Sequence, residues 1–204
     1  MNIFRTTLTV LTLALGLSGI THAQPFKVGD TVPENLTVTD HLGKTRTFGS
    51  FRGHPTVLEW TNYGCPFTRK HYDGGNMQNL QATYTAKGVN WYSVISSAPG
   101  KQGYIEAKDA PGAISKMGFK GTAVILDPTG TLGRAFKAEN TPAMYILDAD
   151  GKLVYSGAID SIPSFSKEDI AKAENYVAKA LDEIFAGQPV STPVTRAYGC
   201  SVKY

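Results

Sequence analysis

A short buried strand followed by a glycine and a Cys-Pro pair constrains the fold of this chain more than any other feature. Residues 56–60 (Thr-Val-Leu-Glu-Trp) are mostly apolar and predict a buried strand. Gly64 ends this pattern, and Cys65-Pro66 predicts the start of a helix, where proline is tolerated. A thiol at that position faces unpaired backbone N–H groups and the positive end of the helix dipole. Both favour the thiolate, which is the reactive form of cysteine.

Positive side chains follow this cysteine within about one helical turn. Arg69 and Lys70 add charge that favours the thiolate, so Cys65 is a candidate nucleophile and Arg69 a candidate for stabilising it. The alternatives are a buried, apolar Cys65 at a strand–helix turn and a solvated Arg69. His71 lies six residues after Cys65, off its helical face, so we expect no metal site there.

The first 23 residues have the pattern of a secretory signal peptide. Arg5 supplies a positive charge, residues 8–20 are apolar with small residues mixed in, and Thr21-His22-Ala23 is a small-residue cleavage site. We therefore expect cleavage after Ala23 and a periplasmic or secreted protein that does not span a membrane. The formal net charge of +3 is small and no dense Lys/Arg run is present, which argues against nucleic acid as a partner.

The exported part alternates between strand and helix signals. It predicts one α/β domain at residues 24–187, with a central mixed sheet flanked by helices, and a tail at residues 188–204 that carries Cys200. Strands are expected at residues 35–40, 56–60, 89–95, 122–126, 142–147 and 152–156. Helices are expected from Cys65-Pro66 to a break at residues 73–76, then across Met77, Leu80 and Tyr84, at residues 103–117 and 132–136, and from a capping box at residues 166–169 to Gly187.

Several short motifs occur in a fixed order along the exported part. They are Val28-Gly29-Asp30, the segment 51–58, Gly64-Cys65-Pro66-Phe67, Asn140-Thr141-Pro142-Ala143, the hairpin 150–157 and the terminal Gly199-Cys200-Ser201. In these motifs the chain resembles the thioredoxin-fold redoxins, and most of all exported peroxiredoxin-like (AhpC/TSA-type) proteins. This resemblance implies a thioredoxin-like fold.

The resemblance also implies roles for residues around Cys65. Thr141-Pro142 would be the cis-proline that packs against the active cysteine, and Trp60 would lie just behind the site. With Pro66, these residues would contact the substrate. The chain departs from its relatives at two positions. Thr68 stands where thioredoxins have their second cysteine, and Asn62 stands where peroxiredoxins have a threonine. Asn62 is a candidate catalytic residue because its amide can donate a hydrogen bond to a peroxide.

Cys200 is the only other cysteine in the chain. A lone thiolate that attacks a disulfide or a peroxide needs a second thiol to reset it. The tail is long enough to reach Cys65, because an extended chain spans about 3.3–3.6 Å per residue. One hypothesis is therefore a Cys65–Cys200 disulfide formed during turnover. The other is a permanent disulfide that fixes the tail.

These observations support two hypotheses of function. The first is an exported thiol-dependent oxidoreductase that exchanges disulfides or reduces peroxides, with Cys65 as nucleophile and Cys200 as resolving thiol. Its partners would be a peroxide or disulfide substrate and a thiol electron donor such as a thioredoxin-like protein, with no cofactor and no metal. The second is a non-catalytic thioredoxin-fold binding module with a structural Cys65–Cys200 disulfide.

Overall fold

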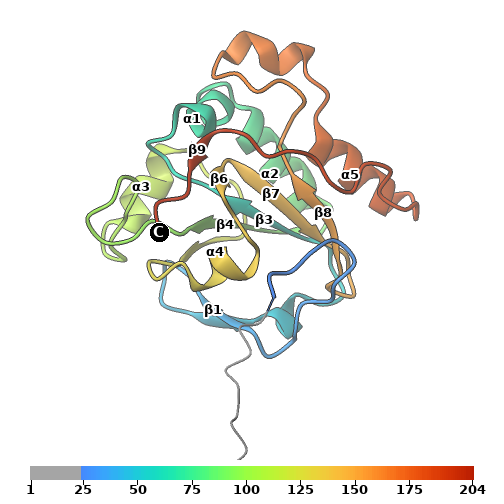
Figure 1. Cartoon of the computed structure of the whole chain (residues 1–204), viewed down its shortest axis with the longest axis horizontal. Coiled ribbons are helices and arrows are strands. Elements are labelled where there is room, and N and C mark those ends of the chain that lie inside the picture. The colour runs from blue at the N-terminus through green and yellow to red at the C-terminus, as the bar shows by residue number, and fades with distance from the viewer. Residues whose placement is uncertain (1–23) are drawn as a thin grey trace, which may run out of the picture.

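A five-stranded mixed sheet forms the centre of the molecule (Figure 1). The computed structural model describes residues 24–204, so the expected signal peptide lies outside the described residues. The strand order is β5-β4-β3-β7-β8, and the first three strands are parallel while β7 and β8 run antiparallel to their neighbours. These strands are β3 (Thr56–Trp60), β4 (Asn90–Ile95), β5 (Ala123–Leu126), β7 (Ala143–Leu147) and β8 (Leu153–Gly157). The predicted α/β fold with a central mixed sheet is confirmed.

Two small antiparallel pairs accompany this sheet. β1 (Thr37–Thr39) pairs with β2 (Thr45–Thr47), and β6 (Asn140–Thr141) pairs with β9 (Cys200–Ser201), which belongs to the tail. The helices are α1 (Pro66–Asp73), α2 (Asn76–Ala86), α3 (Ala110–Lys116), α4 (Thr131–Ala135) and α5 (Tyr176–Phe185). Two 3-10 helices cover Phe48–Phe51 and Lys167–Lys172.

Each face of the central sheet carries its own hydrophobic cluster. One cluster packs α1, α2 and α5 against the sheet through residues such as Met77, Tyr84 and Leu181. The other packs the N-terminal segment and α4 against the opposite face through Phe48 and Phe136. In Figure 1 the sheet accordingly lies between α1, α2 and α5 on one side and α4 and β1 on the other. Among the described residues, no helix is long and apolar enough to cross a membrane.

Most predicted elements are present, but two helices begin later than predicted. The helix expected over residues 103–117 is limited to α3, because Gly103 has a φ of +84° and Pro111 occupies the first turn of α3. Proline fits that position because its missing N–H would have no partner there. The segment before α3 is therefore a loop.

The capping box expected at residues 166–169 does not start the last long helix. Ser166 instead precedes a 3-10 helix, and its hydroxyl bonds to Glu168. The N-cap of α5 is Asn175, whose side chain accepts a hydrogen bond of 2.9 Å from the Ala178 amide. Asparagine is a strong N-cap residue because it satisfies an otherwise unpaired helix amide. The predicted stop at Gly187 agrees with the end of α5 and with its φ of +70°.

The tail does not extend away from the domain. Figure 1 shows it running from α5 across the molecule to β9, beside the start of α1. Near its start the Ser191 amide donates to the Glu183 carboxylate of α5 at 2.8 Å, and further along the Thr195 amide donates to the Ser156 carbonyl of β8 at 3.1 Å. Its last residues are held by the Tyr204 hydroxyl, which donates to the Ala138 carbonyl at 2.7 Å. Cys200 is therefore placed by a docked segment with contacts on both sides.

Candidate active site

Cys65 is the N-cap of α1, directly beyond the end of β3. Its φ and ψ of −82° and 126° are extended, and Pro66 is the first helical residue, as predicted. The Cys65 amide donates to the Asn62 carbonyl at 2.9 Å, and the Cys65 carbonyl accepts from the Arg69 amide at 2.9 Å. The turn after β3 thus fixes the cysteine at the positive end of the helix.

Two segments distant in the sequence meet the Cys65 sulfur. The Thr141–Pro142 peptide bond is cis, as the resemblance implied, and the Thr141 carbonyl oxygen lies 3.1 Å from Cys65 Sγ. Thr141 pairs with Cys200 across β6 and β9. This pairing brings Cys200 Sγ to 2.8 Å from Cys65 Sγ, with both cysteines present as free thiols. A disulfide needs about 2.05 Å, so a bond between these sulfurs would require them to approach by less than 1 Å.

The two thiols differ in acidity. Burial raises the pKa of Cys65, but hydrogen bonds from the Cys200 thiol and from the backbone amides of Thr68 and Cys200 outweigh it, and the pKa falls below its ordinary value. For Cys200, burial and the neighbouring Cys65 raise the pKa to about 11. The first proton therefore leaves Cys65, and the Cys200 thiol donates to the resulting thiolate.

Access to the two sulfurs is also unequal. Cys65 has 0% of its surface exposed, while Cys200 is partly exposed. The groups around Cys65 are polar: the Thr141 carbonyl, the second thiol and helix amides. Cys65 is thus a buried thiol in a polar site, covered in part by the tail itself.

In the structure, the side chains of two of the four candidate catalytic residues, Arg69 and Asn62, bond to partners other than the Cys65 sulfur. Arg69 forms an ion pair with Asp73, at 2.7 Å between Nη2 and Oδ1, and the main causes of the lowered pKa of Cys65 are other groups. Asn62 uses its side chain within the turn: Oδ1 accepts from the Gly64 amide at 2.9 Å, and Nδ2 donates to the Gln102 carbonyl at 3.2 Å. Asn62 therefore shapes the turn that carries Cys65.

The residues expected to contact substrate differ in their exposure. Pro66 is exposed at the start of α1, and the Thr141–Pro142 bond lies against Cys65. Trp60 is 0% exposed and packs against Phe136 and Tyr145, so in this conformation it is a core residue out of reach of a substrate. Contact between Trp60 and substrate stays a prediction, and it would require this packing to open. Within residues 24–204, no three His, Cys, Asp or Glu side chains are grouped to hold a metal ion.

Sequence reasoning missed a cluster of polar side chains near the tail, three buried and one half-buried, which we call the Asp160 cluster. It consists of Lys70, His71, Asp160 and Tyr198. Lys70 Nζ lies 3.0 Å from Asp160 Oδ2, and the two side chains are 0% and 3% exposed. The sequence carried one signal of this cluster, since Lys70 falls on the inward face of α1 where apolar residues are usual.

A second buried network lies beneath the site, on β3. The Glu59 carboxylate is 0% exposed and accepts hydrogen bonds from four side chains. The donors are Tyr72 at 2.8 Å, Gln81 at 3.0 Å, Trp91 at 2.9 Å and Ser93 at 2.9 Å. Burial raises the pKa of Glu59, and these four donors oppose the rise. The network ties β3 to α1, α2 and β4, and so holds the strand that leads to Cys65.

Solved structures resemble this chain over most of its length. An uncharacterised conserved protein from Geobacillus kaustophilus matches with a TM-score of 0.71 and 24% identity, covering 88% of this chain and 93% of that one. A hypothetical protein from Sinorhizobium meliloti matches with a TM-score of 0.71 and 18% identity, covering 89% and 96%. A comparison with curated proteins gave no match.

A further similar structure carries a functional description. A protein from Chlorobium tepidum, assigned as a thiol:disulfide interchange protein DsbE, matches with a TM-score of 0.51 and 22% identity, covering 64% of this chain and 84% of that one. At this identity the likeness supports the thioredoxin-like fold. The family model described as Redoxin matches residues 27–177, which is more than half of the chain. The chain therefore belongs to the Redoxin family and has the thioredoxin-like fold that its motifs implied.

Proposed function

We propose that this protein is an exported thiol-disulfide oxidoreductase in which Cys65 is the nucleophile and Cys200 the resolving thiol. The observation that carries the proposal is the pair of free thiols, with sulfurs 2.8 Å apart and the pKa of Cys65 lowered while that of Cys200 is raised. This is the asymmetry that a nucleophile and its resolving partner require. The Redoxin match and the cis-proline beside Cys65 agree with this assignment.

Disulfide exchange is favoured over peroxide reduction because the polar side chains near Cys65 are already bonded to other partners. Peroxide reduction requires donors that stabilise the oxygen atoms as the O–O bond breaks. The Asn62 amide is engaged by Gly64 and Gln102, and the Arg69 guanidinium is paired with Asp73. The groups left beside Cys65 are the Thr141 carbonyl, which cannot donate, the Cys200 thiol, and the backbone amides of Thr68 and Cys200, which already donate to the Cys65 sulfur.

The proposed oxidation of the pair has two steps. The Cys65 thiolate attacks one sulfur of a substrate disulfide, forming a mixed disulfide and releasing the first substrate thiolate. Cys200 then loses its proton and attacks Cys65 Sγ, which forms the Cys65–Cys200 bond and releases the second substrate thiolate. The substrate disulfide gains two electrons and the cysteine pair loses two, so the exchange balances without a cofactor.

The return to the dithiol needs a thiol electron donor such as a thioredoxin-like protein. Thiolates attack the accessible sulfur and displace the sulfur with the lower thiol pKa. Cys200 is the partly exposed sulfur and Cys65 the better leaving group. The donor therefore forms its mixed disulfide with Cys200, and a second donor thiol then releases Cys200.

The experiment adds glutathione disulfide, and in parallel hydrogen peroxide, to the fully reduced protein. Mass spectrometry then identifies the oxidised cysteines over time. We expect glutathione disulfide to give the Cys65–Cys200 disulfide, and the Cys200→Ser variant to accumulate a glutathione adduct at Cys65. Faster oxidation by peroxide, with sulfenic acid at Cys65 in the variant, would favour peroxide reduction. An unreactive Cys65 with both oxidants would contradict the proposal.

The competing function, a binding module with a permanent disulfide, predicts a different redox potential. Structural disulfides in exported proteins have potentials below about −300 mV, whereas cycling pairs are less negative. Titration of the pair against glutathione and thioredoxin buffers separates the two. A potential above that value supports turnover. A lower one supports a structural disulfide that fixes the tail.

Export is part of the proposal because the first 23 residues have the signal-peptide pattern. An oxidising compartment outside the cytoplasm permits the pair to cycle through a disulfide. Mass spectrometry of the protein from the periplasm or medium should give a chain that starts at Gln24. A chain that retains residues 1–23 and stays in the cytoplasm would contradict this localisation.

A further inference from the structure

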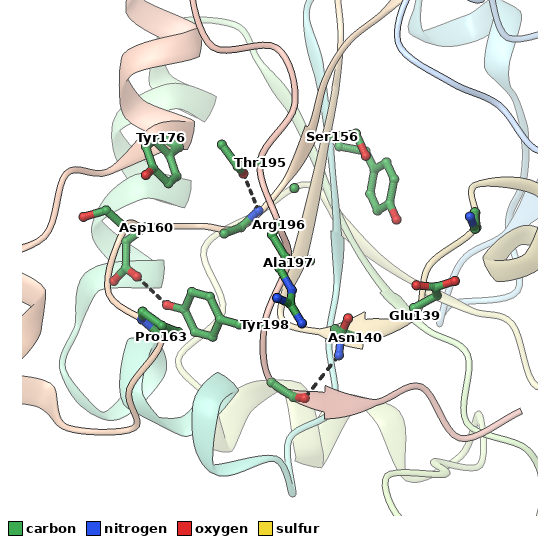
Figure 2. Close-up of a pocket in the computed structure, with 16 residues that line it drawn as sticks. Glu139, Asn140, Ser156, Asp160, Pro163, Tyr176, Thr195, Arg196, Ala197 and Tyr198 are labelled. Atoms are coloured by element: carbon green, nitrogen blue, oxygen red, sulfur yellow. Dashed lines mark hydrogen bonds between the residues drawn. The ribbon is translucent and has the colours of Figure 1, made fainter.

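The part of the tail just before Cys200 crosses a polar cavity. Residues 195–199 form one wall of this cavity, whose volume is about 840 Å³, and the other walls come from β6, β8 and the loop after β8. Figure 2 shows the side chain of Tyr198 extending from the tail toward Asp160, with Arg196 and Asn140 nearer to β9. This stretch is held by polar contacts at Thr195, Tyr198 and Gly199, whose carbonyl accepts from Asn140 Nδ2 at 3.2 Å, and the Tyr198 ring also packs edge-on against Phe67.

Those contacts are unevenly spaced. At one end the Thr195 hydroxyl accepts from the Ala158 amide at 2.8 Å and bonds to the Tyr155 hydroxyl at 2.7 Å. Close to Cys200, the Tyr198 hydroxyl donates to Asp160 Oδ1 and lies 3.4 Å from His71 Nε2. Tyr198, two residues before Cys200, therefore connects the tail to the buried Asp160 carboxylate.

The groups that receive Tyr198 belong in part to the helix that carries Cys65. Lys70 and His71 lie on α1, and both side chains are 0% exposed. Lys70 Nζ donates to Asp160 Oδ2 at 3.0 Å and to the Ile162 carbonyl at 2.9 Å. The Lys70 ion pair fixes the Asp160 carboxylate against α1. The group that accepts the Tyr198 hydrogen bond is therefore held at a fixed position relative to Cys65.

We infer that Tyr198 and Asp160 are positioning residues that hold Cys200 over Cys65 and, by the same contact, close Cys65 to external thiol reagents. The part of the inference that concerns turnover rests on the proposed function, and the part that concerns access does not. Loss of the Tyr198 hydroxyl should expose Cys65 more often and slow its reaction with Cys200. The first step, attack of Cys65 on an external disulfide, should become faster, and the second step, attack of Cys200 on Cys65, should become slower.

The first test measures access to Cys65 alone. In the Cys200→Ser background Cys65 is the only cysteine, and its alkylation by iodoacetamide requires the tail to open because Cys65 has no exposed surface. A hydrogen bond to a charged acceptor is strong enough that its loss changes such an opening equilibrium by about tenfold or more. We therefore expect Tyr198→Phe to raise the alkylation rate about tenfold at constant pH.

The control removes a tyrosine hydroxyl that does not contact the tail. Tyr84 donates to the Ala178 carbonyl at 3.1 Å and to Asp182 at 3.0 Å, linking α2 to α5. Tyr84→Phe should leave the alkylation rate within about twofold of the parent. Asp160→Asn weakens the Tyr198–Asp160 hydrogen bond by removing the charge of the acceptor, so it should raise the alkylation rate of Cys65. Equal rates in the parent, Tyr198→Phe and Asp160→Asn would overturn the inference.

The second test uses glutathione disulfide with Cys200 intact. Tyr198→Phe should form the glutathione adduct at Cys65 faster and convert it to the Cys65–Cys200 disulfide more slowly than the wild-type protein. A variant that merely loosened the fold would not separate the two steps in this way. Slowing of both steps would overturn the positioning role. Faster alkylation without any reaction with glutathione disulfide would support the positioning role and contradict the proposed oxidoreductase function.

Discussion

Replacing Lys70 with methionine tests the buried ion pair beneath the tail. Lys70 and Asp160 are 0% and 3% exposed, and their charged atoms are 3.0 Å apart. Methionine has a similar length and an unbranched stem, so the change removes the charge and leaves little cavity. Asp160 would then keep a buried carboxylate whose remaining partners are the Tyr198 hydroxyl, the Ile162 amide and His71.

The expected loss of stability at pH 8 is about 3–5 kcal/mol, because removing one partner of a buried pair leaves an uncompensated charge. The matched control is Lys108→Met, since the Lys108–Glu106 pair is 75% and 52% exposed. Exposed pairs contribute at most about 1 kcal/mol. The contrast between the two lysines isolates the effect of burial from the effect of the substitution itself.

The loss should depend on pH through His71. Burial lowers the pKa of His71 to about 4, Asp160 raises it and Lys70 lowers it. In the wild-type protein, His71 of the unfolded state therefore binds a proton below pH 6.5, whereas His71 of the folded state stays neutral down to about pH 4. Stability falls by up to about 3 kcal/mol between pH 6.5 and 4. In Lys70→Met the lowering effect of Lys70 is absent, so the pKa of His71 rises and the variant loses less stability on acidification.

The assay is urea unfolding of wild-type and variant proteins at pH 8 and pH 5.5, with a reductant present so that no disulfide forms. The free energy of unfolding of Lys70→Met should lie furthest below that of the wild-type protein at pH 8, and the gap between the two should be smaller at pH 5.5. A loss below about 1 kcal/mol at pH 8 would mean that the buried pair is not a net stabilising interaction. A difference that stays constant or widens at pH 5.5 would refute the assigned coupling between His71 and Lys70.

Three further substitutions test the site. Cys200→Ala removes a donor to the Cys65 sulfur, so the pKa of Cys65 should rise, as measured from the pH dependence of its alkylation; an unchanged midpoint would contradict this. Gly199 has a φ of +120° and a Cβ there would overlap the Thr141 carbonyl oxygen, so Gly199→Ala should displace β9 and slow disulfide formation, measured by quenched thiol alkylation. Glu59→Gln turns an amide toward buried donors and should cost about 2–3 kcal/mol in urea unfolding, and a neutral effect would contradict the assigned network.

The sequence predicts the local elements around Cys65 well because short-range physics determines them. The apolar run at β3, the break at Gly64 and the proline at the first helical position lead to one geometry, and the structure has it. The two misplaced helix starts have local causes too. Pro111 starts α3 instead of weakening it, and Asn175 is a better cap than Ser166 because its side chain reaches a free amide.

The arrangement of the tail could not be predicted from local patterns. Residues 188–204 lack an apolar period, and their positions depend on partners more than 30 residues away, such as the Tyr198–Asp160 and Tyr204–Ala138 contacts. Reach alone allowed Cys200 to meet Cys65 but did not require it. The roles expected for Arg69 and Asn62 stay predictions, because in this structure the Arg69 guanidinium pairs with Asp73 and the Asn62 side chain bonds to Gly64 and Gln102.

Helix α1 links the reactive thiol to the position of its partner. Cys65 caps the helix, and Lys70 and His71 follow five and six residues later, which at 3.6 residues per turn places them one to two turns along the same rigid element. A shift of α1 would therefore move the nucleophile together with Lys70 and His71, the two residues of the Asp160 cluster that α1 carries. Because Lys70 also fixes the Asp160 carboxylate that Tyr198 of the tail contacts, changes at Lys70 should alter thiol exchange as well as stability.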